Sequence, residues 1–154
     1  MSLHKSFIIR PLEPADAAAV SAFMRSQSSE YLRFFYAFGS DESEIAEVLS
    51  KCRMDIYSGV FWEAELVSVF MLRGWDAGYE IPSYGILTDE KYRGNALMSL
   101  TVETAKCICR LSEVKRLMAK YHPDNTAMSK LYRHGFRQTG VEESTGNIIL
   151  HLEI

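Results

Sequence analysis

Apolar residues recur along this chain with two different periods. Short apolar runs of about four to eight residues predict strands, whereas apolar residues three or four positions apart predict amphipathic helices. Strands are predicted at residues 7–10, 59–64, 66–72, 84–88, 116–121, 136–141 and 147–152. Helices are predicted to begin at Pro14 and Asp41, to span residues 93–112, and to span residues 125–132.

Residues that break or cap regular structure support these boundaries. Pro11 is expected to stop the first strand, and the short link at residues 63–65 suits a hairpin. Asp41 and Asn125 are expected N-caps, and Gly135 is expected just after the last helix. This order of elements predicts an α/β (α+β) fold: a mixed, mostly antiparallel sheet with helices on both faces. It forms one domain over residues 1–154, with an ordered core at about 6–153.

The composition narrows the classes of function. The chain has 154 residues, 47% of them hydrophobic, and a formal net charge of −3, which is typical of one globular domain and not of a dedicated nucleic-acid binder. No apolar run approaches the roughly 18–20 residues that span a bilayer, and residues 1–5 lack the apolar segment of a secretory signal. The three cysteines form no CxxC pair and are interpreted as reduced thiols of a cytoplasmic protein. No cluster of His, Cys, Asp and Glu has metal-ligand spacing, so no metal is expected.

The most informative segment joins the predicted strand at residues 84–88 to the long predicted helix. A glycine-containing turn, with Arg93 and Gly94, lies between them. The first amides of such a helix have no intrahelical acceptors and lie at the positive end of the helix dipole. A diphosphate can therefore bind there, with Arg93 as a further donor. Alone, this pattern is weak evidence, since any strand–turn–helix with one Arg–Gly pair shows it.

A second segment, residues 122–136, makes the interpretation more specific. It follows the glycine turn by one long helix and one strand, and it contains Asn125, Leu131, Tyr132, Gly135 and Phe136. In these residues the sequence resembles the GNAT acyltransferases, where a similar run follows the cofactor helix and an Arg–Gly turn precedes that helix. One alanine of the run lies one position early, at Ala127. The order of elements matches over essentially the whole chain.

The resemblance implies a single-domain GNAT fold and an acetyl-CoA-dependent N-acetyltransferase. In that family a primary amine attacks the acetyl carbonyl directly within a ternary complex. A backbone N–H of the strand before the turn would hold the developing oxyanion, and Tyr132 would protonate the departing thiolate. The base is left open, with His122 as first candidate and Glu80 as second. The cofactor-binding positions that the resemblance implies are Ile86, Leu87, Thr88, Arg93, Gly94, Asn95, Ala96, Leu97, Met98, Asn125 and Tyr132.

The turn departs from the family pattern at two positions. Ala96 and Met98 stand where the family has small residues, mostly glycine. Alanine still exposes its amide, but methionine adds bulk near the expected pyrophosphate. A second hypothesis is therefore a catalytically weak acyl-CoA-binding or subunit-interaction module on the same fold, which cofactor binding without CoA release would favour. Asn125 is expected to bond the pantetheine, to cap its helix, or both.

The expected acceptor is a small-molecule amine. Five aromatic residues in the segment 31–38 either wall the acceptor site, as that segment does in the family, or belong to the core. Residues 74–85 look like family members of bacterial amino-sugar pathways, which suggests a nucleotide-linked amino sugar. The residues assigned to substrate binding are Tyr31, Phe35, Trp75 and Tyr84. The resemblance also allows a homodimer, since dimers through sheet edges are common in that family.

Overall fold

The structure, a computed structural model, describes residues 5–154. Its centre is a seven-stranded sheet with strand order β1-β2-β3-β4-β5-β7-β6. Neighbouring strands are antiparallel except β4 and β5, which are parallel. This confirms the predicted mixed, mostly antiparallel sheet. The strands are β1 (Phe7–Pro11), β2 (Ile56–Trp62), β3 (Glu65–Arg73), β4 (Ser83–Thr88), β5 (Arg116–Tyr121), β6 (Arg137–Val141) and β7 (Ile148–Glu153).

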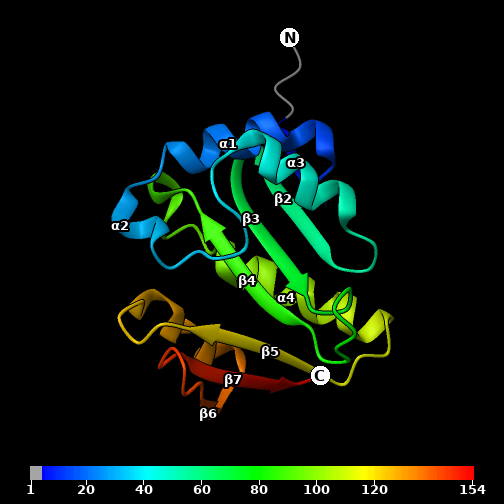
Figure 1. Cartoon of the computed structure of the whole chain (residues 1–154), viewed down its shortest axis with the longest axis vertical. Coiled ribbons are helices and arrows are strands. Elements are labelled where there is room, and N and C mark those ends of the chain that lie inside the picture. The colour runs from blue at the N-terminus through cyan, green and yellow to red at the C-terminus, as the bar shows by residue number, and fades with distance from the viewer. Residues whose placement is uncertain (1–4) are drawn as a thin grey trace.

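Helices cover both faces of the sheet (Figure 1). Two of them, α1 and α3, pack on one face, while α4 and the 3-10 helix η3 pack on the other. Each face therefore has its own hydrophobic core, as a sheet between two helical layers requires. The helices are η1 (Pro14–Asp16), α1 (Ala17–Arg25), α2 (Ser29–Leu32), α3 (Glu42–Lys51), η2 (Glu90–Tyr92), α4 (Leu97–Leu111) and η3 (Thr126–His134).

Strand β3 contributes to both cores. Val69 and Met71 pack with the α1 and α3 layer, and Phe70 and Leu72 pack with the α4 layer. Successive side chains of a strand point to opposite faces, so a strand covered on both faces is apolar throughout. This explains why the sequence of this segment shows only weak alternation.

The predicted hairpin between β2 and β3 is confirmed, and its turn has a clear backbone requirement. Glu63 and Ala64 both have positive φ, at 50° and 67°, and they separate the paired residues Trp62 and Glu65. Two consecutive left-handed residues match the right-handed twist of the flanking strands. The sequence shows this turn by its length and not by residue type, because neither residue is glycine.

Two local expectations, at Asn125 and at the start of the long helix, need correction, whereas β1 ends at Pro11 as predicted and includes that residue. Because β1 is an edge strand, a residue there without an N–H costs little. The segment after Asn125 is a 3-10 helix, and the Asn125 side chain makes no capping hydrogen bond. The long helix begins at Leu97, since the turn before it is not helical. By contrast, Asp41 does cap α3 by accepting from the Glu44 N–H at 3.0 Å.

An ion pair between Arg10 and Asp16 connects the first strand to the first helical turn. Asp16 accepts two hydrogen bonds of 2.8 Å from the Arg10 guanidinium and one of 2.7 Å from the Glu13 N–H. The hydrogen bond from Arg10 is the main reason that the pKa of Asp16 lies below its ordinary value. A carboxylate with a lowered pKa stabilises the fold above its unfolded pKa, and this stabilisation is lost as the pH falls.

We expect Asp16→Asn to lower the free energy of unfolding by about 1 kcal/mol at pH 7, because the pair is part-exposed and its charge is screened. Asparagine can still accept from Glu13, so the change isolates the ionic part. The difference from the unsubstituted chain should shrink between about pH 5 and pH 2, as Asp16 becomes protonated. Urea unfolding of both chains at several pH values measures this difference in the free energy of unfolding. A difference that stays constant down to pH 2 would contradict the ionic origin.

The described residues hold few features outside this architecture. Cys52, Cys107 and Cys109 are free thiols. Over residues 5–154, no helix combines the length and apolar character that crossing a membrane needs. The same residues contain no group of three or more His, Cys, Asp or Glu side chains placed to hold a metal ion.

Candidate active site

The sheet opens at its centre, between β4 and β5. Their pairing is limited to one position, Ser83 opposite Met118, where the Met118 N–H donates to the Pro82 carbonyl at 2.9 Å. Beyond that point the two strands diverge, as Figure 1 shows. The edge of β4 that faces β5 therefore presents backbone groups to the gap. Such an open edge can bond an extended ligand that carries amide groups.

The hydroxyl of Tyr31 occupies one end of this open edge. It donates to the Thr88 carbonyl at 2.8 Å and accepts from the Thr88 N–H at 3.1 Å. Backbone groups on one edge of an antiparallel strand recur every second residue, so those of Ile86 also face the gap. Of the three predicted positions on β4, Ile86 is thus the one whose N–H remains available to a ligand. Leu87 is paired with Val69 and is buried.

The turn before α4 has the backbone shape of an anion site. Gly94 and Ala96 both have positive φ, at 82° and 59°, and nothing lies within 4 Å of where a Cβ on Gly94 would be. The first amides of the helix that follows have no intrahelical acceptors. The Arg93 guanidinium lies 4.3 Å from the Tyr31 ring, so Tyr31 links this turn to the end of β4. The turn thus has the backbone shape and the donors that suit an anionic group such as a diphosphate.

The bulk of Met98 packs at least in part toward the interior. Its side chain is half-buried and packs against the hydrophobic core on the α4 face. Leu97 packs against the same core. Asn95 is exposed, and its side-chain amide donates to the Tyr92 carbonyl at 2.9 Å. At least part of the bulk of Met98 is therefore accommodated inside the fold.

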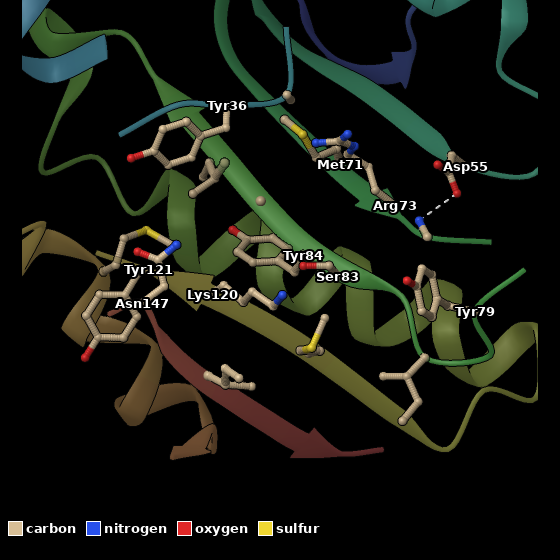
Figure 2. Close-up of a pocket in the computed structure, with 18 of the residues that line it drawn as sticks. Tyr36, Asp55, Met71, Arg73, Tyr79, Ser83, Tyr84, Lys120, Tyr121 and Asn147 are labelled. Atoms are coloured by element: carbon tan, nitrogen blue, oxygen red, sulfur yellow. Dashed lines mark hydrogen bonds between the residues drawn. The ribbon is translucent and has the colours of Figure 1, made fainter. Parts of the chain in front are cut away.

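A cavity of about 1140 Å³ lies at the gap between β4 and β5. Segments far apart in the sequence line it, namely residues 34–37, the ends of β3 and β5, the β3–β4 loop and β7 (Figure 2). Predicted site residues in its lining are Phe35, Glu80, Tyr84, Ile86, His122 and Asn125. Those placed outside the lining are Tyr31, Trp75, Leu87, Thr88, Tyr132 and the turn residues Arg93, Gly94, Asn95, Ala96, Leu97 and Met98.

Two of the predicted substrate residues are held in the core. Tyr84 is 2% exposed, and its hydroxyl lies 2.8 Å from that of Thr101 on α4. Burial raises the pKa of Tyr84 well above its ordinary range, so its hydroxyl stays neutral. Trp75 is half-buried and packs on the α4-face core. Tyr84 still lines the cavity, as Phe35 does, whereas Trp75 lies outside the lining.

The two base candidates differ in availability. His122 accepts a hydrogen bond at Nδ1 from the Asp124 N–H, at 3.1 Å. An accepting Nδ1 is unprotonated, so a neutral His122 carries its proton on Nε2 and has no second free lone pair. Glu80 is exposed on the β3–β4 loop. Within residues 5–154, no hydrogen bond or ion pair engages its carboxylate.

Tyr132 lies on η3 beside a second tyrosine that the sequence analysis did not single out. Tyr121, at the end of β5, is buried in the cavity wall. Burial, followed by the neighbouring Tyr132 hydroxyl, raises the pKa of Tyr121 to about 12. Tyr121 therefore stays protonated beside Tyr132. The sequence feature that could have pointed to Tyr121 is its position directly before His122. The strand pattern alone explained Tyr121 as a core residue.

Two further lining residues were missed. Arg73 ends β3 and reaches into the cavity, and Asn147 precedes β7. The Asn147 side-chain oxygen is buried without a hydrogen-bond partner, which is costly unless a ligand or water supplies one. The sequence could have pointed to Arg73, because it is a charged residue that follows a continuous apolar strand. No sequence feature marks Asn147 as a site residue, because it lies in an ordinary turn sequence.

Comparison with known proteins identifies the family. The profile of the acetyltransferase (GNAT) domain matches residues 6–137, so this chain belongs to the GNAT acetyltransferase family. It is an acyl-CoA-dependent N-acetyltransferase with acetyl-CoA as co-substrate, and these predictions are confirmed. None of the curated proteins compared with the chain matches it.

Solved structures confirm the fold. A GNAT-family acetyltransferase from Streptococcus pneumoniae is 22% identical, with a TM-score of 0.74 and coverage of 97% of this chain and 99% of that one. The PaiA N-acetyltransferase of Thermoplasma acidophilum, solved with coenzyme A, is 14% identical, with a TM-score of 0.74 and coverage of 97% and 99%. An acetyltransferase from Salmonella typhimurium that modifies the N-terminal serine of ribosomal protein L7/L12 is 14% identical, with a TM-score of 0.79 and coverage of 97% and 95%. At these identities the likeness extends to the fold alone.

Proposed function

We propose that this enzyme acetylates the primary amine of a small molecule bound in the cavity between β4 and β5. The observation that best supports this proposal is the cavity. It has a volume of about 1140 Å³, walls on several sides and the open strand edge at Ile86. Small-molecule sites are concave, mostly apolar, and contain a few placed polar groups. A protein N-terminus would instead need a groove that leaves room for the following residues.

The reaction is a direct displacement at the thioester. The amine nitrogen forms a bond to the acetyl carbon, the carbon–sulfur bond breaks, and an amide and CoA thiol result. The Ile86 N–H donates to the carbonyl oxygen as negative charge develops on it. The proton of the amine passes to a base, and Tyr132 supplies one to the sulfur. The cavity walls contribute by holding the amine in line with the carbonyl.

Glu80 is the better-supported base. Its carboxylate is unengaged, whereas the Nδ1 atom of His122 already accepts from the backbone. Through one ordered water, an exposed carboxylate on the cavity rim can take the proton of an incoming ammonium. His122, with its proton on Nε2, is suited to donate to an acceptor oxygen instead. The proposal therefore assigns proton removal to Glu80 and orientation of the acceptor to His122.

The rim of the cavity favours acceptors with a flat face. Tyr36 and Tyr79 belong to its lining and are 71% and 68% exposed. Exposed aromatic rings at a binding site gain stability by stacking against rings and apolar faces of a ligand. A nucleotide-linked amino sugar has both a base and a sugar face, and it is the first acceptor to test.

Acetyl-CoA is expected to raise the melting temperature strongly. At about 100 times the dissociation constant, binding adds ~2.7 kcal/mol, which corresponds to roughly 5–11 °C for a chain of this size. The measurement is a thermal melt with and without acetyl-CoA, followed by an amine screen that records CoA thiol release. The screen contains amino sugars, nucleotide-linked amino sugars, polyamines and short peptides with free N-termini.

The outcomes separate three functions. Release of CoA with a small amine supports the proposal. Release with peptides alone would replace it with protein N-terminal acetylation, the activity named for the Salmonella structure. A thermal shift without release for any amine would favour the acyl-CoA-binding module.

A further inference from the structure

Arg73 is a cation in the cavity without a protein counter-ion. It ends β3, is half-buried, and lines the cavity. Over residues 5–154, no carboxylate lies within 4.0 Å of its guanidinium. Its polar neighbour is the Tyr57 hydroxyl, whose pKa is raised by burial and lowered in part by Arg73. A guanidinium has five N–H donors, so one hydroxyl neighbour leaves most of them without a protein acceptor, which is unfavourable for a partly desolvated group. The remaining donors of a cavity-lining guanidinium can bind an acceptor group on a ligand.

Asp55, a carboxylate in the same cavity lining, already accepts hydrogen bonds from the backbone. One of its oxygens accepts from the Gly74 N–H at 2.9 Å and from the Asp76 N–H at 3.1 Å. Asp76 in turn accepts from the backbone N–H groups of Arg53 and Met54, at 2.9 and 2.7 Å. These reciprocal bonds fix the start of the β3–β4 loop. Figure 2 shows the Arg73 side chain directed away from Asp55.

The other basic groups of the cavity are neutral or paired. Lys120 forms an ion pair of 2.8 Å with Glu142. Burial, and then the charge of Arg116, lower the pKa of His151, so it is uncharged near neutral pH. Among the described lining residues, Arg73 is thus a permanent positive charge with no carboxylate within 4.0 Å. Because its planar fork matches two oxygens at once, a carboxylate or phosphate is the preferred partner.

The position of Arg73 determines how far the anionic group of a ligand lies from the reacting amine. Arg73 and Met71 point to the same face of β3, and Met71 is paired with Gly85, the residue before Ile86. Arg73 itself is paired with Ser83, three residues before Ile86 and so about 10 Å away along the strand, a span that the long Arg73 side chain can shorten. An amine near the Ile86 N–H and an anionic group at Arg73 can belong to one small molecule.

We propose that Arg73 selects acceptors that carry an anionic oxygen group, a carboxylate or a phosphate, a few bonds from the primary amine. This inference rests on the proposed function, since it names the class of amine that the cavity takes. Arg73 binds the anionic group with two parallel hydrogen bonds and fixes the direction in which the amine enters. Neutral alkylamines lack this anchor and are poorer substrates.

The test compares matched amines on three variants. The amines are an ω-amino carboxylate, an O-phosphorylated amino alcohol and the n-alkylamine of the same length. The variants are Arg73→Met, which removes the charge at similar bulk, Arg73→Lys, which keeps the charge without the fork, and Arg53→Met. Arg53 is exposed outside the cavity lining and is the matched control. CoA thiol release gives kcat/KM for each pair.

The unsubstituted enzyme is expected to prefer an anionic amine over the alkylamine by about 30-fold, the range of a charge-assisted pair. Arg73→Met should remove this preference by raising KM for the anionic amines, while kcat/KM for the alkylamine stays unchanged. Arg73→Lys should keep part of the preference. Arg53→Met should change neither the preference nor the alkylamine rate. The two anionic amines show whether carboxylate or phosphate is the partner. Equal preference for charged and neutral amines, or an equal loss for both in Arg73→Met, overturns the inference while leaving the proposed function intact.

A binding measurement keeps the test decisive if no amine is turned over. Calorimetric titration of the ω-amino carboxylate and of the phosphorylated amine is carried out with CoA present, on the unsubstituted chain and on Arg73→Met. Binding of either amine that is lost in the variant supports the anion site even though the proposed function has failed. Equal binding in both chains, or absence of binding of both amines to the unsubstituted chain, rejects it. An unchanged acetyl-CoA melting shift in Arg73→Met shows that the variant is folded.

Discussion

Tyr132→Phe is expected to lower kcat by about 100-fold, the lower end of the range for a general acid. The lower end applies because a thiol has a pKa of roughly 8.5 and is a fair leaving group without help. The KM for acetyl-CoA should change little, since the hydroxyl acts mainly at the moment the sulfur departs. For the same reason the deficit should narrow as the pH rises above about 8.5. Initial rates over a pH series measure both effects.

Tyr121→Phe is the discriminating control for this assignment. Tyr121 holds its proton firmly, with a pKa raised to about 12 by burial and by the Tyr132 hydroxyl. If Tyr132 is the acid, losing the Tyr121 hydroxyl alters only the environment of that acid, and the rate should fall by much less. A larger loss in Tyr121→Phe than in Tyr132→Phe would move the acid to β5. Equal small losses would mean that the thiolate leaves unprotonated.

Gly135→Ala is expected to reduce the free energy of unfolding by about 3 kcal/mol. Gly135 has φ of 98°, and a Cβ there would lie 2.9 Å from Leu152 Cδ1. The left-handed conformation costs about 1–2 kcal/mol for an L-residue, and overpacking adds about 1–3 kcal/mol. The melting temperature should fall by about 6–12 °C for a chain of this size. Thermal and urea unfolding both measure the change.

Gly146→Ala separates the two contributions. Gly146 also has a positive φ, 75°, but nothing lies within 4 Å of the added Cβ. It should therefore show the conformational cost alone, about 1–2 kcal/mol. Equal destabilisation by the two substitutions would mean that Leu152 moves aside without cost.

Most of the fold could be predicted because local pattern and burial agree. The helix at α4 has its apolar residues at helical spacing, and its buried positions Val102, Ala105 and Cys109 lie on one face. Gly135 marked the end of η3, and its positive φ explains why glycine is needed there. The type of η3 was not predictable, since α and 3-10 helices use the same residues and differ by their packing.

The candidate site could be predicted in part only. The turn at Arg93 and Gly94 is visible in the sequence because the chemistry and the backbone requirement are local. The bond between Tyr31 and Thr88 joins residues 57 positions apart, and no spacing rule predicts such a contact. Arg73 was missed for a similar reason, because its missing counter-ion becomes evident only once Asp55 is seen to be held elsewhere.

The single bridge at Ser83 and Met118 has a consequence for self-association. A strand edge with open backbone groups ordinarily attracts a strand of another molecule and leads to aggregation. Here the edge at Ile86 is recessed, with the segment 34–37 on one side and the start of η3, at Asn125 and Met128, on the other. A strand of another molecule would have to pass these flanking segments to pair at Ile86, whereas the outer strands β1 and β6 carry no such cover from a neighbouring strand. Pairing between copies of this chain is therefore expected at the outer edges of the sheet rather than at its central opening.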